Sequence, residues 1–373
     1  MQTVKLKLTA LTPLHLGTGE DYDPTNFVID NGYLYEFSET KFFKNLDTKQ
    51  KDEFLKAVES KSYESLFAIH RVIKQNKKTA IDAAFNRVQV SKDIQKAYDK
   101  KIGRAVQIEG GKRRPNTKVF NQFLIAKTSR LKNDHRVYIP GSSLKGAIST
   151  ALQEYIYKKD KRLYKKLFEE SFPSENFMKE LSLADTQPLK TYAVTGYALN
   201  KERFEEDEQG PNTMLEVIYS SEKQQSQFET TLTFKEEFCT LPYQTDIKEI
   251  QKAANEHYLP IFKQMFKPFA NFKGKSIDDF TNEYFSESFY EKYKNFELKD
   301  NQFLLRVGKY SQARAVTIDG MRKIRVKISG GGPRRKPNRW ETLDQETTTW
   351  MFGLNDRANN NLMPFGWVLC EVL

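Results

Sequence analysis

The chain has 373 residues, of which 60 are lysine or arginine and 49 are aspartate or glutamate, so its formal net charge at pH 7 is +11. This length suffices for one large or two ordinary domains. The basic excess favours a polyanionic partner, with nucleic acid ahead of an anionic membrane surface. No apolar run approaches the ~18 residues that span a bilayer, and Cys239 and Cys370 are too few and too far apart for a disulfide framework or a zinc site. We therefore expect a cytosolic (cytoplasmic) protein with no membrane segment, no metal and no cofactor.

The amino terminus predicts a half-buried strand followed by a hairpin. From residue 3 to residue 10 polar and apolar side chains alternate, which is typical of a strand and not of a signal peptide. After a turn-rich loop at residues 12–19, two apolar runs at residues 27–30 and 33–37 flank Asn31 and Gly32. An Asn-Gly pair between such runs is the strongest short signal for a type I′ hairpin turn.

His15 lies in the loop at residues 12–19. It is a poor candidate for metal binding or catalysis, because no second histidine lies at ligand spacing. The other histidines are scattered: His70, His135 and His257. The acidic cluster just after the loop is more typical of a solvated segment than of a metal site and would repel phosphate: Glu20, Asp21 and Asp23.

Residues 41–118 read as an insertion, helical up to about residue 98. Its last part, residues 100–118, is basic and carries glycines, with Lys112, Arg113 and Arg114 at its centre. Such a loop can clamp a phosphate backbone or can be a solvated loop, and the pattern favours neither reading.

The most informative stretch is YIPGSSLKGAISTAL, residues 138–152. A turn at Pro140 and Gly141 leads into a helix that we expect Ser142 or Ser143 to cap. Apolar residues recur from Leu144 onward at helical spacing and predict a buried stripe. The first helical amides favour an anion, Lys145 adds a charge, and Gly146 lies off the stripe where a phosphate could come close. The alternative is a well-capped core helix with no ligand.

The carboxyl-terminal third predicts a buried strand over residues 303–308, followed by Lys309. Residues 321–328 alternate Lys/Arg with Ile/Val, and the segment SGGGPRRK follows at residues 329–336. Its glycines leave backbone amides open to an anion, and three cations adjoin them: Gly330, Gly331, Gly332, Arg334, Arg335 and Lys336. No Gly-Lys-Ser/Thr opens a helix here, so the segment is not a nucleotide-hydrolysing loop. Backbone RNA binding is favoured over a merely flexible loop.

These stretches resemble the RAMP (repeat-associated mysterious protein) subunits of type III CRISPR effector complexes, most closely the Csm5-type subunits of the type III-A (Csm) complex. The resemblance rests on YIPGSSLKGAISTAL, LTPLHLGTGEDYDPTNFVID, FLLRVGKYSQARAVTIDG, the glycine loop and MPFGWVLCEV. It departs at Ser149, where an arginine is expected, and it fades over residues 41–118 and 236–298.

The resemblance implies an α+β fold of tandem ferredoxin-like or RRM-like domains. It also implies a non-catalytic subunit that caps the backbone filament beside Csm3-like subunits and other Csm subunits and holds the 3′ part of the CRISPR RNA. The RNA contacts that we expect are His15, Gly17, Gly141, Ser142, Ser143, Lys145, Gly146, Lys309 and the glycine-loop residues named above. Lys112, Arg113 and Arg114 form a further candidate loop.

We place one RAMP domain at residues 1–205, with the insertion at about 41–118, and a second at residues 206–373, divided at the acidic stretch 202–210. Two other functions stay open. The chain could be an endoribonuclease that uses Lys145, Ser142 and His15 as an acid–base set, or an assembly protein that caps the filament and recruits a maturation nuclease.

Overall fold

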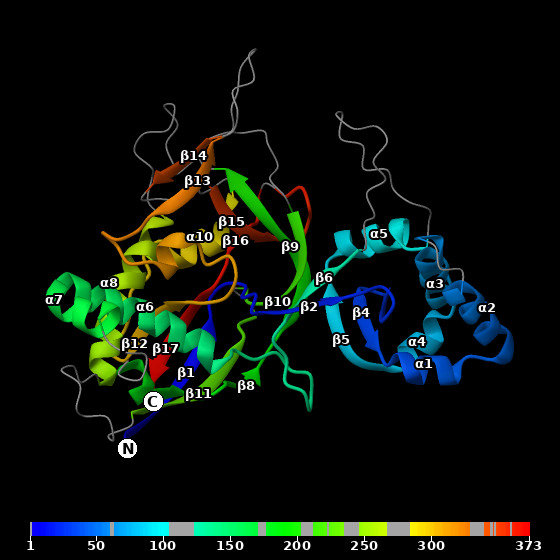
Figure 1. Cartoon of the computed structure of the whole chain (residues 1–373), viewed down its shortest axis with the longest axis horizontal. Coiled ribbons are helices and arrows are strands. Elements are labelled where there is room, and N and C mark those ends of the chain that lie inside the picture. The colour runs from blue at the N-terminus through cyan, green and yellow to red at the C-terminus, as the bar shows by residue number, and fades with distance from the viewer. Residues whose placement is uncertain are drawn as a thin grey trace, which may run out of the picture.

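The computed structural model describes residues 2–59, 63–103, 123–170, 177–202, 212–221, 224–234, 246–266, 284–328, 339–343, 346, 348–358 and 360–373. Helices and strands are mixed along the chain, and the strands form two sheets and a two-stranded ribbon. The expected α+β class is therefore confirmed. Figure 1 shows a larger lobe that contains both chain ends and a smaller, mostly helical lobe. Strands β9 (Ala193–Glu202) and β10 (Asn212–Ile218) lie between the lobes.

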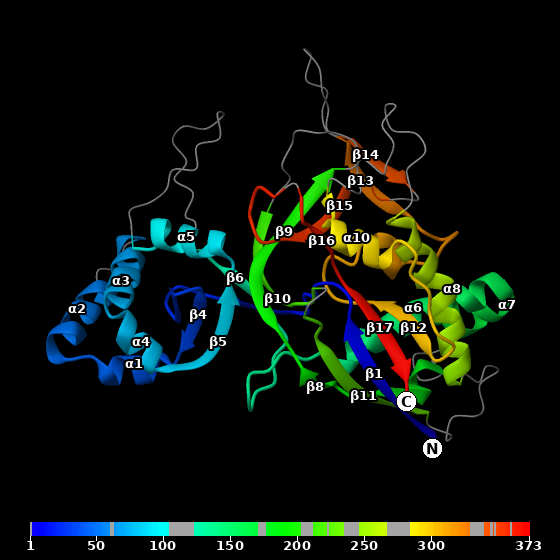
Figure 2. The same ribbon diagram turned by 180° about the vertical axis from the view of Figure 1, so that it is seen from behind.

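The first sheet has six strands and joins the two ends of the chain. Its order is β12-β17-β1-β11-β7, with β8 also paired to β11, and all of its pairs are antiparallel. The strands are β1 Gln2–Ala10, β7 Leu181–Leu183, β8 Gln187–Lys190, β11 Gln227–Phe234, β12 Gln302–Arg306 and β17 Trp367–Val372. Together with two helices, β1, β7, β11 and β12 follow the βαββαβ path of a ferredoxin-like unit, and β17 is inserted between β1 and β12. Figure 2 shows β17 beside β1 from behind.

The two helices of this unit are α6 (Gly141–Lys159) and α8 (Ile247–Gln264), which pack against each other. Helix α6 also contacts β7, and α8 contacts β12. The stripe predicted on α6 is confirmed, because every one of its members is buried: Leu144, Ala147, Ile148, Ala151, Leu152, Tyr155 and Ile156. Shorter helices nearby are α7 (Lys161–Tyr164) and α10 (Glu287–Tyr293).

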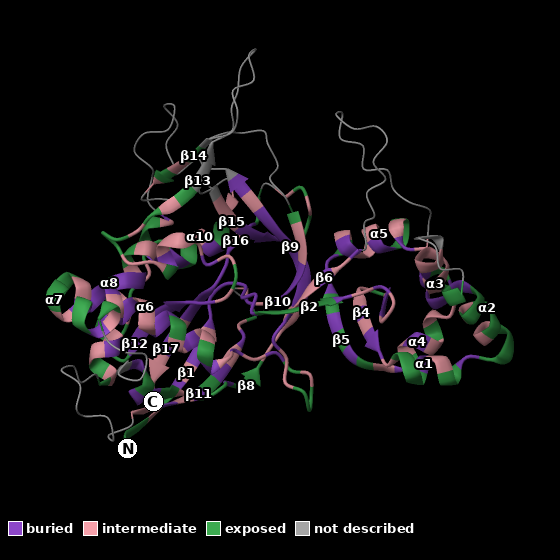
Figure 3. Ribbon diagram, in the orientation of Figure 1, coloured by how far each residue is buried: buried purple, intermediate pink, exposed green. Residues whose placement is uncertain are grey.

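The second sheet has nine strands in the order β2-β6-β10-β9-β5-β4-β3, with β15 paired to β9 and to β16. Its remaining strands are β2 Gly17–Tyr22, β3 Phe27–Asp30, β4 Tyr33–Phe37, β5 Ala84–Val90, β6 Ile125–Thr128, β15 Thr348–Gly353 and β16 Met363–Pro364. The ribbon pairs β13 (Ile324–Ile328) with β14 (Arg339–Leu343). Buried residues lie in the strands of both sheets and on the inner faces of α6 and α8 (Figure 3).

The smaller lobe confirms the hairpin and corrects part of the helical prediction. Strands β3 and β4 pair antiparallel, and Asn31 and Gly32 have φ of 49° and 79°, the positive values that a type I′ turn requires. The helices are α1 Glu39–Asn45, α2 Thr48–Glu59, α3 Tyr63–Gln75, α4 Lys77–Asp82 and α5 Lys92–Lys101. Residues 84–90 were expected to be helical but form β5, because alternate residues pack inward there: Asn86, Val88 and Val90.

Both sheets draw strands from either side of the boundary expected at residues 205/206. Strand β1 pairs with β11 and β17, and β9 pairs with β10 and β15. The division into two consecutive domains, residues 1–205 and 206–373, stays a prediction. Three strands of the ferredoxin-like sheet, β11, β12 and β17, lie after residue 206.

A buried carboxylate joins the second sheet to the loop that contains His15. Glu216 on β10 is fully buried. Its Oε2 accepts hydrogen bonds from the Tyr22 hydroxyl at 3.1 Å and the Thr128 amide at 3.2 Å, and its Oε1 accepts from Arg130 Nε at 2.9 Å. The main-chain carbonyl of Glu216 lies 2.7 Å from His15 Nδ1. One residue thus ties together β2, β6, β10 and the His15 loop.

The same network extends into the smaller lobe. Burial, followed by the negative charge of Glu216, raises the pKa of Tyr22 well above 10.0, so this hydroxyl stays protonated. Asn86 Nδ2 donates to the Tyr22 hydroxyl at 3.2 Å and to Glu36 at 3.0 Å. Lys127 Nζ donates to the other Glu36 oxygen at 2.6 Å. Polar contacts therefore hold the smaller lobe to the sheet in addition to strand pairing.

Replacing Glu216 with alanine should strongly destabilise the protein, because the Arg130 side chain, which is only 14% exposed, would stay largely buried without its carboxylate. Loss of one partner of a buried ion pair costs about 3–5 kcal/mol, measurable as a lower free energy of unfolding in urea. The matched control is Glu20→Ala, whose side chain is exposed and whose loss should change stability by less than about 0.5 kcal/mol. Similar stabilities of the two variants would contradict the role given to Glu216.

Candidate nucleic-acid interface

The start of α6 is capped from outside the helix, and the predicted Ser142 or Ser143 cap is wrong. Pro140 occupies the N-cap position, and no side chain there accepts a hydrogen bond. Instead, Asp185 Oδ1 accepts from the Gly141 amide at 2.8 Å. The β7–β8 connection that carries Asp185 passes close to this turn, since a Cβ on Gly141 would lie 2.3 Å from the Leu183 carbonyl oxygen.

Lys145 is also held by this neighbouring segment. Its Nζ donates to the carbonyl oxygen of Leu181 at 2.8 Å, and the residue is half-buried. A negatively charged side chain and a backbone carbonyl of the chain itself thus occupy part of the place where a phosphate was expected. An anion at this helix start would have to compete with Asp185.

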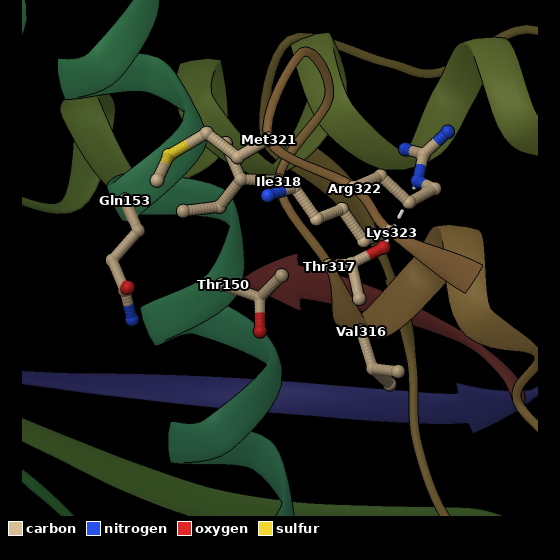
Figure 4. A pocket seen from close by; sticks show the side chains of 8 residues that line it. All are labelled: Thr150, Gln153, Val316, Thr317, Ile318, Met321, Arg322 and Lys323. Atoms are coloured by element: carbon tan, nitrogen blue, oxygen red, sulfur yellow. Dashed lines mark hydrogen bonds between the residues drawn. The ribbon is translucent and has the colours of Figure 1, made fainter. Parts of the chain in front are cut away.

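The face of α6 that begins at Gly146 is open. A Cβ built on Gly146 meets nothing within 4 Å, and the residue is exposed. One and two turns further along, Thr150 and Gln153 line a cavity of about 260 Å³ that is open to solvent. Its other wall comes from the segment after β12 (Figure 4), namely Val316, Thr317, Ile318, Met321, Arg322 and Lys323.

This wall, the segment 313–323, begins with a 3₁₀ turn (Ala313–Val316) and is anchored by a buried carboxylate of α6. Glu154 Oε2 lies 2.8 Å from His257 Nδ1 on α8 and accepts from the Asp319 amide at 2.8 Å. Glu154 Oε1 accepts from Lys158 Nζ at 2.7 Å. Burial alone would raise the pKa of Glu154, but the hydrogen bond and charge of His257, with Lys158 and the Asp319 amide, outweigh it and lower this pKa to about 2.

The other end of the segment 313–323 is fixed as well. Arg314 forms an ion pair with Glu346, with Nε 2.7 Å from the carboxylate, and both side chains are largely buried. The Arg322 Nε donates to Thr317 Oγ1 at 2.9 Å. Lys323, by contrast, is exposed at the edge of the cavity. The segment therefore has a fixed backbone and presents an exposed cation at its end.

The structure brings three of the predicted residues together elsewhere. Lys309 N donates to the His15 carbonyl oxygen at 2.9 Å, and a Cβ on Gly17 would lie 3.2 Å from His15 Nε2. Burial, opposed by the hydrogen bond to Glu216 and helped by Lys309, lowers the pKa of His15 below 6.5, so the ring is neutral at pH 7. Gly17 and Lys309 are exposed, whereas His15 is buried. We therefore expect Lys309, and not the imidazole, to be the main anion contact here.

The remaining predicted contacts lie outside the described residues. These are Lys112, Arg113 and Arg114 of the first basic loop, and Gly330, Gly331, Gly332, Arg334, Arg335 and Lys336 of the glycine segment. They stay predictions. The glycine segment is continuous in sequence with β13 and β14, and hence follows closely on Lys323.

Thr150, Gln153, Arg322 and Lys323 were not among the predicted contacts. A signal for the last two was present, because residues 321–328 alternate cations with β-branched residues. No sequence signal pointed to Thr150 and Gln153, because nothing in the neighbouring sequence indicates that a segment more than 160 residues further on packs beside them.

Two of the three side chains considered above for acid–base catalysis, Lys145 and His15, are bonded to backbone carbonyls of the chain. Lys145 is bound to the Leu181 carbonyl and His15 to the Glu216 carbonyl, so each has a structural partner. In the described part of the chain, no three His, Cys, Asp or Glu side chains come close enough to hold a metal ion. Nor is any described helix long and apolar enough to cross a membrane.

A family model for the RAMP superfamily matches residues 7–307. The chain belongs to the RAMP superfamily. It is 22% identical to "CRISPR system Cms protein Csm5" of Methanocaldococcus jannaschii, over 98% of this chain and 88% of that protein. The resemblance to Csm5-type RAMP subunits inferred from the motifs is therefore confirmed.

Two solved structures share the fold at 15% sequence identity each. One is a chain of a Csm–crRNA–target RNA ternary complex in a type III-A CRISPR-Cas system, with a TM-score of 0.60 over 99% of this chain and 100% of that one. The other is Csm5 of T. onnurineus, with a TM-score of 0.53 over 98% of this chain and 100% of that one. The RAMP fold thus extends over almost the whole chain.

The two glycines of the helix motif should respond oppositely to alanine. Gly141→Ala places a Cβ 2.3 Å from the Leu183 oxygen, and we expect a loss of about 1–3 kcal/mol, as for other overpacked sites. Gly146→Ala meets open space and should gain about 1 kcal/mol from helix propensity. Urea unfolding of both variants checks this. A destabilised Gly146→Ala protein would show that this face is not open.

The Glu154 anchor should lose its effect in acid. Its pKa is about 2 in the folded protein against 4.5 ordinarily, so its ionisation contributes stability that is present above about pH 4.5 and lost as pH falls towards 2. Glu154→Gln should therefore destabilise the protein at pH 7 and progressively less below pH 4.5. The free energies of unfolding of both proteins at several pH values test this, and a pH-independent difference would contradict it.

Proposed function

We propose that this chain is a non-catalytic, RNA-binding subunit of a type III-A Csm interference complex in antiviral defence. It caps the backbone filament, contacts Csm3-like subunits and holds the 3′ part of the CRISPR RNA. Membership of the RAMP superfamily and similarity to proteins named Csm5 support the complex. The other structural neighbour is a chain of a complex with crRNA and target RNA, which supports RNA as the ligand.

The observation that carries RNA binding is the open face of α6 at Gly146 beside the cationic edge of the segment 313–323. An RNA strand that crosses this face can bring its sugar-phosphate backbone against Gly146 without meeting a side chain. Lys323 supplies a positive charge at the rim of the cavity. Phosphate contacts of this kind position a strand but carry no sequence information. That suits a guide whose target is read by base pairing.

This function predicts that Lys323→Glu, and separately Gly146→Glu, weaken binding of single-stranded RNA several-fold. The first change replaces an attractive charge with a repulsive one, and the second fills the open face with a negative side chain. Loss of one phosphate contact should also reduce the slope of log K against log salt by about 1. Binding of two unrelated labelled RNAs at several salt concentrations measures both effects.

The control is Lys49→Glu, which changes an exposed lysine of α2 in the smaller lobe. Its affinity should stay close to that of the unchanged protein. Equal losses in all three variants would indicate only a general charge effect, and a loss confined to one RNA sequence would contradict a phosphate contact. The labelled RNA should also be recovered at full length. If the RNA is shortened, and a further purification of the protein does not remove this activity, the endoribonuclease alternative would be favoured.

The finer assembly roles need a separate measurement. Co-purification from the native host should recover this chain with Csm3-like subunits and a guide RNA. If a maturation nuclease is recruited, the recovered guide should be longer when this chain is deleted. Guides of unchanged length would remove that part of the proposal.

A further inference from the structure

The cavity between α6 and the segment 313–323 has a mixed lining, in which the apolar side chains all come from the segment 313–323. Val316 and Met321 are 58% and 39% exposed, yet both are large apolar side chains on one rigid segment. Between them and α6 lies the cavity of about 260 Å³ (Figure 4). Exposed apolar side chains that gather at one hollow mark a place where a ligand binds.

The size and charge of the cavity narrow the choice of ligand. Its volume lies just below the range of about 300–1,000 Å³ that is typical of pockets for drug-sized molecules, and this suits a single flat ring system. Lys323 lies at the rim, and Arg322 contributes to the lining. A hollow with apolar side chains on one wall and cations at its edge complements a flat ring that is attached to a negatively charged chain, which describes a nucleotide within RNA.

The polar side of the cavity fits the same ligand. Thr150 and Gln153 face the apolar wall from α6, and Gly146 lies one turn before Thr150 with open space above it. A sugar-phosphate backbone that passes over Gly146 therefore leaves its next base beside the hollow. Gln153 Nε2 donates one hydrogen to Ser149 Oγ at 3.0 Å, and its second N–H hydrogen and its carbonyl oxygen can bond to the edge of a base.

We propose that this cavity binds one unstacked base of the RNA strand, held between the apolar side chains of Val316 and Met321 and the polar face of α6. The proposal rests on the RNA-binding function proposed above and adds a base subsite to it. Binding is by shape and apolar contact and does not depend on base identity. The subsite fixes the position of the RNA strand along α6, because only one base enters the cavity.

The cavity is built before RNA arrives. Glu154 fixes the backbone of the segment at Asp319, and the Arg314–Glu346 pair fixes it near Val316, at 2.8 Å and 2.7 Å respectively. A wall that is already ordered does not lose conformational freedom when the base enters. This preorganisation lets a small hollow contribute measurable affinity.

The test compares two probes that carry the same number of phosphates: an RNA octamer of uridines and an octamer of the same ribose-phosphate chain without bases. If a base subsite exists, the unchanged full-length protein should bind the uridine octamer several-fold more tightly than the abasic one. In the double variant Val316→Ser, Met321→Ser this ratio should fall towards one, while affinity for the abasic octamer stays the same. Both side chains are substantially exposed, so the variant should fold, and urea unfolding checks this.

A second variant separates this cavity from another stacking site. Trp340 on β14 is 56% exposed, with the Arg325 guanidinium 5.0 Å from its ring, and could stack on a base by itself. Trp340→Ala should leave the preference for the uridine octamer unchanged. If instead Trp340→Ala abolishes the preference and the serine variant keeps it, the subsite is not in this cavity and the proposal is overturned.

The remaining outcomes are equally clear. Equal affinity of the unchanged protein for the two octamers would overturn the base subsite but leave phosphate-mediated RNA binding in place. Failure to bind either octamer, with no binding of longer RNA, would overturn the proposed function itself.

Discussion

The junction between the two lobes depends on one charged side chain held away from water. A buried carboxylate is costly unless every oxygen is bonded, and Glu216 meets this condition with donors from β2, from β6 and from Arg130. Because those donors come from two separate segments, β2 and residues 128–130, the carboxylate is satisfied only when both segments are in place. Its carbonyl in turn orients His15. The geometry of the His15 loop is therefore set by the sheet beneath it.

Local signals in the sequence predicted local structure well. The turn at Asn31 and Gly32 and the stripe on α6 depend only on neighbouring residues, and both are present. The cap of α6 was mispredicted for the opposite reason, because its acceptor, Asp185, is 44 residues away. Strand β5 shows the same limit: its short alternating run was read as part of a helical insertion, and pairing with β4 and β9 made it a strand.

The sequence placed the candidate interface at the start of α6, whereas the open face of this helix begins at Gly146 and runs along its side. The positive charge expected at the start of α6 is partly offset by Asp185, which no local pattern could reveal. The face at Gly146 gains its significance from the segment 313–323, which Glu154 holds beside it across a separation of 165 residues. Long-range contacts of this kind determine which of many lysines and arginines lie next to an open backbone. Composition alone gives their number and not their place.

Strand β17 has a consequence for how the protein is made. It lies between β1 and β12 in the first sheet, although it is formed by residues 367–372. During translation β1 and β12 leave the ribosome before β17, which pairs with both of them. The edges of β1 and β12 that pair with β17 therefore stay open until β17 is synthesised. Such edges are sites of aggregation. The facing edge of β1 therefore stays unpaired while residues 11–366 are synthesised, and chaperone binding during this interval would protect it.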